Sequence, residues 1–424
     1  MKTFLPFFLI FNMLTALFSS CDENILIDPC HIKPCDTVVI KPPIIDSNIV
    51  WQYNADTINN SCVSILPLLY ENTVLFTNGT RNLGEPFVFF NKTTGEIINQ
   101  AIDPENTDGM SAGIHQYKNF AVITDWYKIY IIDLRQNMLL RTFNLRDFGY
   151  EGLPRISGLG EYVFIPVEKI GATKQEYANT WLRWNILTDQ MDEILTIEDK
   201  GTFVAGFESL AFWFKPNGDT VMIFQNRQYD FINRNRRIDM YAYNMTEKKI
   251  EWQIDSFTRT GNTSVFPIIV KGDRFYFQGS NEAFCFSCID GHQIWNKYFP
   301  GEGFFRTNAL LAEGKYIIKG ESDKMYALDE NTGSSAWENP TAGHSNSNML
   351  YHNGSVYYET GQDGLGVLRG LRVSTGKVEW TYFSSNYPKY SNVSFGLSGI
   401  AIDSMTNYIY SNDRVFHMCI KLPK

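Results

Sequence analysis

The stretch that decides the fold is YALDENTGSSAW (326–337), an apolar strand, a polar turn at Gly333 and a second strand ending in Trp337. Three further copies are LRVSTGKVEW (371–380), CFSCIDGHQIW (285–295) and YAYNMTEKKIEW (241–252). Weaker copies are FFNKTTGEIIN (89–99), YIIDLRQNMLLR (130–141) and WNILTDQMDE (184–193). Self-similarity at a period of about 40–50 residues is typical of propellers and repeat arrays. We therefore expect a single repeat domain.

Each copy carries the signature of a tight hairpin turn. The turn residues recur at spacings of 42, 52, 59, 43, 42 and 43, and they are Gly95, Asn137, Asp189, Lys248, Gly291, Gly333 and Gly376. In five copies an Asp or Asn stands four residues earlier, at Asn91, Asp133, Asn185, Asn244 and Asp329. A short polar side chain that binds its own backbone, followed by a residue that tolerates positive φ, favours such a turn.

A tryptophan follows the turn by four residues in the last four copies, at Trp252, Trp295, Trp337 and Trp380. A ring of this size can pack one repeat against the next. We therefore interpret these tryptophans as structural and assign them no catalytic role.

Between the turns, the sequence alternates like strands and gives four strands per unit of about 42 residues, which fits one blade of a β-propeller. After Trp380, residues 398–421 offer only three strands, and IVWQYN (49–54) supplies a fourth with Trp51. If this N-terminal strand pairs with the strand around Cys419, the ring closes with eight blades and no open edge. Seven blades with a separate N-terminal strand is the alternative.

Composition narrows the class of protein. The 424 residues are 44% hydrophobic and 15% aromatic, which excludes a disordered chain, and the formal net charge is −9. A negative charge disfavours binding to nucleic-acid phosphates, so no nucleic-acid partner is expected.

The N-terminus predicts export. Residues 1–20 have a basic Lys2, an apolar stretch and two small residues before Cys21, as in a secretory signal peptide. Residues 17–21 (LFSSC) resemble a bacterial lipoprotein signal, although Phe18 departs from its usual pattern, and the resemblance implies lipid attachment at Cys21. Residues 21–48 are then a flexible tether, and residues 49–424 are the propeller. Ordinary secretion without a lipid is the alternative.

The remaining cysteines carry no metal-site pattern. Cys30 and Cys35 flank a short turn and form a possible disulfide. Cys285 and Cys288 are three residues apart, so on a strand they would face opposite sides and could share neither a bridge nor a metal.

The repeat resembles that of the pyrroloquinoline quinone (PQQ)-like β-propellers over roughly residues 49–424. It departs from that pattern in the first three copies, where Asn99, Arg141 and Glu193 replace the tryptophan. The family contains quinone-dependent dehydrogenases and cofactor-free members, including the propeller lipoprotein of the outer-membrane β-barrel assembly machinery. This chain lacks the adjacent cysteine pair of the dehydrogenases and any grouping of carboxylates assignable to Ca²⁺. We therefore expect the cofactor-free branch, with no cofactor and no catalytic or metal-binding residue.

The two long spacings predict a partner-binding face. The extra residues fall between the second and third strands of the third and fourth units, at KIGATKQEYAN (169–179) and QNRQYDFINRNRR (225–237). Two neighbouring loops on one face would form a raised wall, and loops on a rigid scaffold commonly carry binding sites. The candidate partner-binding residues are Lys174, Tyr177, Arg227, Tyr229, Phe231, Arg234, Arg236 and Arg237. They suit an acidic or anionic partner, unless the arginines only pair with nearby acids such as Asp230 and Asp239.

These features predict a monomeric, non-catalytic propeller lipoprotein of the cell envelope, anchored to a membrane, with the outer membrane as the expected one. Its partner would be an envelope protein or a polymer. The alternatives are a quinone- or metal-dependent oxidoreductase and a surface glycan-binding lipoprotein.

Overall fold

The computed structural model describes residues 48–54, 66–77, 86–102, 113–124, 128–152, 156–170, 179–198, 203–230, 232–259, 268–303, 308–320, 322–343, 347–362, 365–384, 395, 399–413 and 415–423. All of them belong to one compact unit, Ile45–Lys424. The predicted signal peptide, the lipid-attachment residue Cys21, the possible Cys30–Cys35 disulfide and residues 21–47 of the predicted tether lie outside the described residues.

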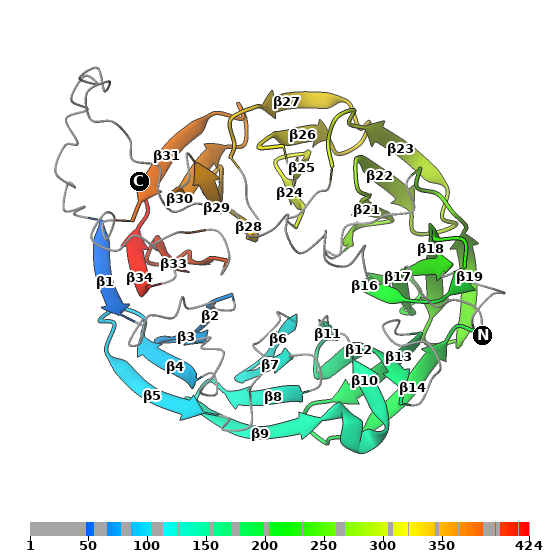
Figure 1. The fold of residues 1–424 in the computed structure, drawn as a ribbon, viewed down its shortest axis with the longest axis horizontal. Coiled ribbons are helices and arrows are strands. Elements are labelled where there is room, and N and C mark those ends of the chain that lie inside the picture. The colour runs from blue at the N-terminus through cyan, green and yellow to red at the C-terminus, as the bar shows by residue number, and fades with distance from the viewer. Residues whose placement is uncertain are drawn as a thin grey trace, which may run out of the picture. The chain divides into compact units, whose positions relative to one another are not determined.

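Eight antiparallel sheets, each built on a path of four strands, form a ring in the described part of the chain (Figure 1). Blade 1 consists of β2 (Leu68–Tyr70), β3 (Thr73–Thr77), β4 (Pro86–Asn91) and β5 (Ile97–Ile102). Blade 2 consists of β6 (Gly113–Tyr117), β7 (Phe120–Thr124), β8 (Lys128–Asp133) and β9 (Met138–Asn144). Blade 3 follows the 3₁₀ helix η3 (Leu145–Phe148) and consists of β10 (Tyr150–Gly152), β11 (Ser157–Leu159), β12 (Tyr162–Lys169), β13 (Thr180–Asn185) and β14 (Met191–Thr196). Blade 4 consists of β15 (Phe203–Val204), β16 (Phe207–Phe214), β17 (Thr220–Asp230), β18 (Asn235–Asn244) and β19 (Lys249–Ile254).

The second half of the ring continues in the same order. Blade 5 consists of β20 (Ile269–Lys271), β21 (Arg274–Gln278), β22 (Glu282–Ser287) and β23 (Gln293–Tyr298). Blade 6 consists of β24 (Leu310–Ala312), β25 (Lys315–Lys319), β26 (Met325–Asp329) and β27 (Ser335–Asn339). Blade 7 consists of β28 (Met349–His352), β29 (Ser355–Gln362), β30 (Leu365–Arg372) and β31 (Val378–Phe383). Blade 8 consists of β32 (Ala401–Asp403), β33 (Tyr408–Asn412), β34 (Phe416–Lys421) and the N-terminal strand β1 (Ile49–Asn54).

The ring closes by pairing strands from the two ends of the propeller. β1 pairs with β34 in antiparallel fashion, and Trp51 lies opposite Cys419. This strand completes the sheet whose other members are β32 and β33. The predicted closure with eight blades is confirmed, and the alternative of seven blades with a separate strand is wrong.

The core is divided into eight hydrophobic clusters, and each lies between two neighbouring blades. At the closure, for example, Trp51 and Cys419 of blade 8 pack with Phe76 and Phe90 of blade 1. Since each blade buries apolar side chains on both of its faces, its strands form nearly continuous hydrophobic runs, such as those of β3 and β22. The stability of the ring therefore depends on the joints between blades.

All seven predicted turn residues adopt positive φ, from 54° at Asn137 and Lys248 to 73° at Gly95. The preceding Asx side chain accepts the hydrogen bonds that the sequence predicts. At the first turn, the Asn91 Oδ1 accepts from the backbone N–H groups of Thr93 and Thr94 at 2.9 and 3.1 Å. The predicted hairpin chemistry is confirmed.

Four of the tryptophans dock on the turn of the next blade. Their indole N–H groups donate to the carbonyl one residue after the Asx position of that turn, at 2.7–3.0 Å; the pairs are Trp51 to Lys92, Trp252 to Cys288, Trp295 to Glu330 and Trp337 to Val373. Each ring also covers the glycine of that turn, where an added Cβ would come within 2.6–2.9 Å of it; these glycines are Gly95, Gly291, Gly333 and Gly376. The four tryptophans thus join neighbouring blades, and their packing explains why glycine occupies the turns that they cover.

Trp380 has no equivalent turn to cover, because the outer strand of blade 8 comes from the other end of the chain. Its ring packs at the edge of the hydrophobic cluster between blades 7 and 8. It stacks with Tyr382 of its own blade, with ring centres 6.1 Å apart.

The antiparallel order of the strands gives the ring two faces. First-to-second and third-to-fourth strand turns leave one face, here called the turn face. Second-to-third strand hairpins and the connections between blades leave the opposite face, here called the connection face.

Candidate functional site

The most distinctive feature of the connection face is the hairpin of β17 and β18 in blade 4. Its strands pair without interruption from Val221 opposite Asn244 to Asp230 opposite Asn235. β17 and β18 have 11 and 10 residues, whereas β25 and β26 of blade 6 have five each. The prediction of a loop over residues 225–237 is therefore wrong, because most of these residues lengthen two strands and only residues 231–234 connect them.

The tip of this hairpin repeats the chemistry of the repeat turns. The Asp230 Oδ1 accepts from the backbone N–H groups of Ile232 and Asn233 at 2.9 and 3.0 Å. Arg234, four residues after Asp230, has a φ of 56°. Five of the repeat turns have Asp or Asn four residues before the residue of positive φ, and Asp230 and Arg234 have the same spacing. This spacing could have predicted the hairpin. Its tip exposes 76% of Ile232.

The arginines of the hairpin lie over buried acids and aromatic rings. Arg227 forms an ion pair of 2.8 Å with Glu208, whose side chain is 2% exposed. Arg237 lies 3.6 Å from Asp239, which is fully buried. The alternative of pairing with acids is thus correct for Asp239. The Asp230 carboxylate binds the hairpin tip.

Two of these arginines also stack on aromatic side chains. The Arg236 guanidinium lies 5.4 Å from the ring centre of Tyr229, and that of Arg237 lies 4.7 Å from the ring centre of Phe203. Phe203 comes from β15, which pairs with the end of β17. Sequence reasoning missed Phe203 because nothing in its local sequence indicates that pairing. Phe231, Lys174 and Tyr177, the other predicted partner-binding residues, lie outside the described residues.

A ring of buried polar side chains lies deeper at the same end of the blades. These side chains occupy the same position in the second strand of each blade's four-strand path. In blade 1, for example, Thr73 lies opposite Asn91 of the turn, and the ring position is Thr77, four residues further along the strand. The polar members of the ring are 0–3% exposed, and they are Thr77, Thr124, Gln225, Gln278, Lys319, Glu359 and Asn412. Blade 3 has the buried Pro166 there. A change from threonines to amides and charged groups therefore separates the first blades from the later ones.

Lys319 of this ring is a buried charge that binds the connection between two blades. Burial lowers the pKa of its ammonium to about 8. Lys319 donates to the Gly343 carbonyl, Arg369 donates to that of Thr341, and the Tyr358 hydroxyl donates to that of Ala342 at 3.1 Å. Three consecutive carbonyls are thus held by buried donors, which fastens the connection between blades 6 and 7.

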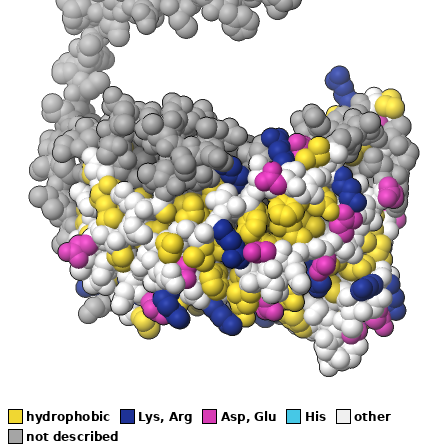
Figure 2. Space-filling view, turned by 90° about the horizontal axis from the view of Figure 1, so that it is seen from below, with side chains coloured by type: hydrophobic (Ala, Val, Ile, Leu, Met, Phe, Trp, Pro, Cys, Tyr) yellow, Lys and Arg dark blue, Asp and Glu magenta, His cyan; other side chains and the backbone are white. Residues whose placement is uncertain are grey.

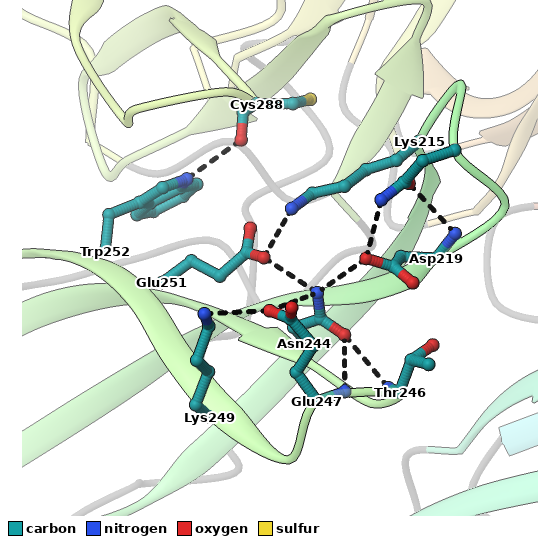
Figure 3. Close-up of polar contacts among 10 residues, drawn as sticks. Lys215, Asp219, Asn244, Thr246, Glu247, Lys249, Glu251, Trp252 and Cys288 are labelled. Carbon is teal, nitrogen blue, oxygen red and sulfur yellow. Dashed lines mark hydrogen bonds and ion pairs between the residues drawn. The ribbon is translucent and has the colours of Figure 1, made fainter.

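The turn face carries a separate polar cluster around Asn244 (Figure 3). The Asn244 amide nitrogen donates to Glu251, Asp219 and Glu247 at 2.8, 3.1 and 3.3 Å, while Lys215 pairs with Glu251 (Figure 3). Burial alone would raise the pKa of Glu251, but hydrogen bonds from Lys215 and Asn244 outweigh it and lower that pKa. Asn244 is fully buried, and its side chain serves the turn.

The described cysteines are free and buried. Cys285 faces blade 6 and Cys288 faces blade 4, as their spacing predicts. Burial raises the pKa of the Cys285 thiol to about 11 and that of Cys419 to about 12. These thiols are therefore protonated and unreactive at neutral pH.

The described residues contain neither a cluster of metal ligands nor a membrane-spanning helix. In this part of the chain, no three His, Cys, Asp or Glu side chains come together in a way that could hold a metal ion. Within the same residues, no helix has the length and apolar character needed to cross a membrane.

The outer strands of blades 1 and 2 form a different kind of surface. β5 exposes 40% of Ile97 and 45% of Ile98, and β9 exposes 38% of Met138 and 37% of Leu140. Figure 2 views the ring from the side of β5 and β9 in Figure 1, and hydrophobic side chains gather there between charged ones.

Comparisons with known proteins agree with this architecture. The sequence profile of the family described as outer membrane protein assembly factor BamB matches residues 286–405, which include Trp295, Trp337 and Trp380. No curated protein sequence matches the chain.

Three solved structures are similar in fold. BamB from Moraxella catarrhalis has 10% identity and a TM-score of 0.58, with 88% of this chain and 99% of that chain covered. Quinohemoprotein alcohol dehydrogenase from Comamonas testosteroni has 10% identity and a TM-score of 0.62, with 89% and 77% covered. Sqt1 from Saccharomyces cerevisiae has 8% identity and a TM-score of 0.61, with 89% and 99% covered. The repeats of residues 286–405 therefore match the PQQ-like family, and the described part of the chain closes into an eight-bladed β-propeller.

Proposed function

We propose that this propeller binds another protein of the cell envelope through its connection face and acts as a scaffold without catalysis. The observation that carries the proposal is the hairpin of β17 and β18, which is about twice as long as the corresponding strands of blade 6. A propeller closes without such an extension, so the added length serves something other than the ring. Binding residues are commonly held out from a rigid scaffold in this way.

The hairpin suits protein binding because it is ordered before a partner arrives. Its uninterrupted ladder and the Asp230 turn fix the backbone, so little conformational entropy is lost on binding. Ile232 supplies an exposed apolar contact at the tip, and arginine and tyrosine beside it are residue types enriched at the energetic centres of interfaces.

The location in the envelope is part of the same proposal. The match to a family described as an outer membrane assembly factor supports it, as does the lipoprotein-like segment that ends at Cys21. Two acyl chains at Cys21 would hold the protein on a membrane surface, and the predicted tether would let the ring stand away from it. Replacing Cys21 by Ser tests this step, and we expect the variant to leave the membrane fraction in cell fractionation.

The binding role is tested by photo-crosslinking in the producing cell. The full chain carries a photoreactive amino acid at Ile232, and a control variant carries it at Met405, which is 86% exposed on the turn face. We expect a discrete protein adduct from position 232 and none of that mass from position 405. Equal labelling from both positions, or no protein adduct from position 232, would refute the proposal.

A further inference from the structure

A fifth arginine continues the chemistry of the hairpin into blade 5. Arg259 follows β19 in the connection to blade 5, and its Nε lies 3.0 Å from Glu282. The backbone N–H of Arg259 also donates to Glu282 at 3.0 Å. The guanidinium lies 4.7 Å from the ring centre of Tyr298. Arg259 is 61% exposed, whereas the side chain of Glu282 beneath it is 2% exposed.

The connection that carries Arg259 is fastened to the hairpin. The Asp239 carboxylate accepts from the Gln228 amide at 2.8 Å and from the backbone N–H of Ser256 at 3.0 Å. The same carboxylate lies beside Arg237. Arg237 and Arg259 are therefore held on one continuous surface across blades 4 and 5, although they are 22 positions apart in the sequence.

We call this region the arginine–aromatic surface. It is defined by partly exposed arginines, the aromatic rings under three of them, and the tip of the hairpin: Arg227, Arg234, Arg236, Arg237, Arg259, Phe203, Tyr229, Tyr298 and Ile232. A guanidinium that lies on a ring and is bound by a carboxylate loses little side-chain freedom when a ligand arrives. The surface is therefore pre-organised.

The charge of this surface decides between classes of partner. Three of its five arginines pair with the buried carboxylates of Glu208, Asp239 and Glu282. Asp230 is a fourth buried carboxylate in the hairpin, so the formal charge of these nine groups is only +1. Binding to a polyanion depends on a strong excess of positive charge. Instead, this arrangement favours local pairing with one or two carboxylates, together with apolar contacts to the rings and to Ile232.

From this geometry, we propose that the arginine–aromatic surface binds a segment of a partner protein in which acidic side chains stand next to apolar ones. The inference rests on the protein-binding role proposed above and specifies the chemistry of the partner. Arg236 and Arg259 would meet the acidic groups, and Ile232 would meet the apolar ones.

The test begins with the adduct formed from position 232, whose crosslinked segment is mapped by mass spectrometry. We expect acidic residues within a few positions of the crosslink. The double variant Arg236→Glu and Arg259→Glu should reduce the adduct yield at least tenfold. Arg183→Glu is the matched control, because Arg183 also lies over a ring, that of Tyr162 at 5.0 Å, and pairs with Asp192 at 2.8 Å. It should leave the yield within about twofold. Thermal unfolding of all variants confirms that the ring is intact.

A second measurement uses defined probes. A synthetic peptide of the mapped segment should bind the full chain, and replacing its acidic residues by Lys should abolish binding to the wild type and restore binding to the double variant. An adduct whose segment has no acidic residue, or a yield unchanged in the double variant, would overturn this inference while the scaffold role stands. Binding to phosphatidylglycerol vesicles that the double variant loses, without peptide binding, would assign the surface to anionic headgroups and overturn it as well. Absence of any protein adduct would remove the scaffold role itself.

Discussion

Blades 4–6 and blades 1 and 2 solve the same packing problem with different chemistry. In the later joints, the rings of Trp252, Trp295 and Trp337 cover a turn glycine of the next blade and donate to a backbone carbonyl. In the first joints, Asn99 donates to the Asn137 carbonyl at 2.8 Å, and Arg141 donates to the Ile186 carbonyl at 2.7 Å. The hydrogen bond to the next turn is thus retained, whereas the buried ring is not.

The comparison explains why the turn residues differ along the chain. A turn covered by a tryptophan has glycine, because a Cβ there would collide with the ring. The turns at Asn137, Asp189 and Lys248 follow blades without the tryptophan, and they carry a side chain despite their positive φ. The residue at the tryptophan position of one blade therefore restricts which residue can occupy the turn of the next blade. We expect the tryptophan joints to contribute more stability than the polar ones.

The largest effect is expected for Trp295→Ala. It removes a 7%-exposed ring from the joint between blades 5 and 6 and leaves the Glu330 carbonyl without its donor. Truncation of a buried aromatic residue costs about 3–5 kcal/mol. Urea unfolding followed by circular dichroism measures the loss. A cost below about 1 kcal/mol would show that the ring contributes little to the joint.

Acid should weaken the closure joint between blades 8 and 1. His417 is fully buried, packs against Phe76 at 4.3 Å and bonds to Asn412 at 2.8 Å. Burial lowers its pKa from 6.5 to about 3. Because the unfolded chain binds the proton more readily, the stability contributed by neutral His417 is complete above about pH 6.5 and is lost as the pH falls toward 3, by roughly 3 kcal/mol at pH 4.5.

The measurement compares urea unfolding at pH 7.5 and 4.5 for the wild type and for His417→Gln. The variant can still accept the Asn412 hydrogen bond but does not titrate. Its loss of stability between the two pH values should be smaller than that of the wild type. Equal losses would show that other groups set the acid sensitivity of the ring.

Gly333→Ala tests the glycine side of a tryptophan joint. Gly333 has a φ of 69°, and an added Cβ would lie 2.7 Å from the Trp295 ring. Gly149 has a φ of 83° with nothing within 4 Å of an added Cβ. Gly149→Ala therefore measures the cost of placing a side chain at positive φ without a collision. We expect about 1–2 kcal/mol for the control and about 1–3 kcal/mol more for Gly333→Ala. If thermal unfolding gives equal losses of stability for the two variants, the Trp295 indole moves aside at no measurable cost in free energy.

The repeats made most of this architecture predictable from the sequence. The period, the turn residues and the tryptophans are local signals, and the incomplete last unit indicated the pairing of Trp51 with Cys419. The polar joints were not predicted, because Asn99 and Arg141 bind backbone atoms 38 and 45 positions away. No local pattern identifies such a partner.

The candidate surface was predicted only in part. The cluster of Arg227, Arg236 and Arg237 was visible as a local reversal of charge, but its backbone was taken for a loop. Phe203 and Arg259 were missed, since each reaches the surface through contacts made by other strands. Local charge therefore identified the region. The burial of the acids beneath it, on which the proposed class of partner rests, is visible only in the fold.

The smallest effect is expected for Asn99→Ala in a polar joint. Asn99 is exposed, and its hydrogen bond to the Asn137 carbonyl is the contact that connects β5 to the next turn in place of an indole. Loss of one such bond costs about 0.5–1.5 kcal/mol, and water can replace the donor at an exposed site, so we expect the lower end of that range. Urea unfolding measured beside Trp295→Ala gives the ratio of the two joints. Comparable costs would contradict the division of the ring into strong and weak joints, because they would place the stability of each joint in its hydrogen bond rather than in the buried ring.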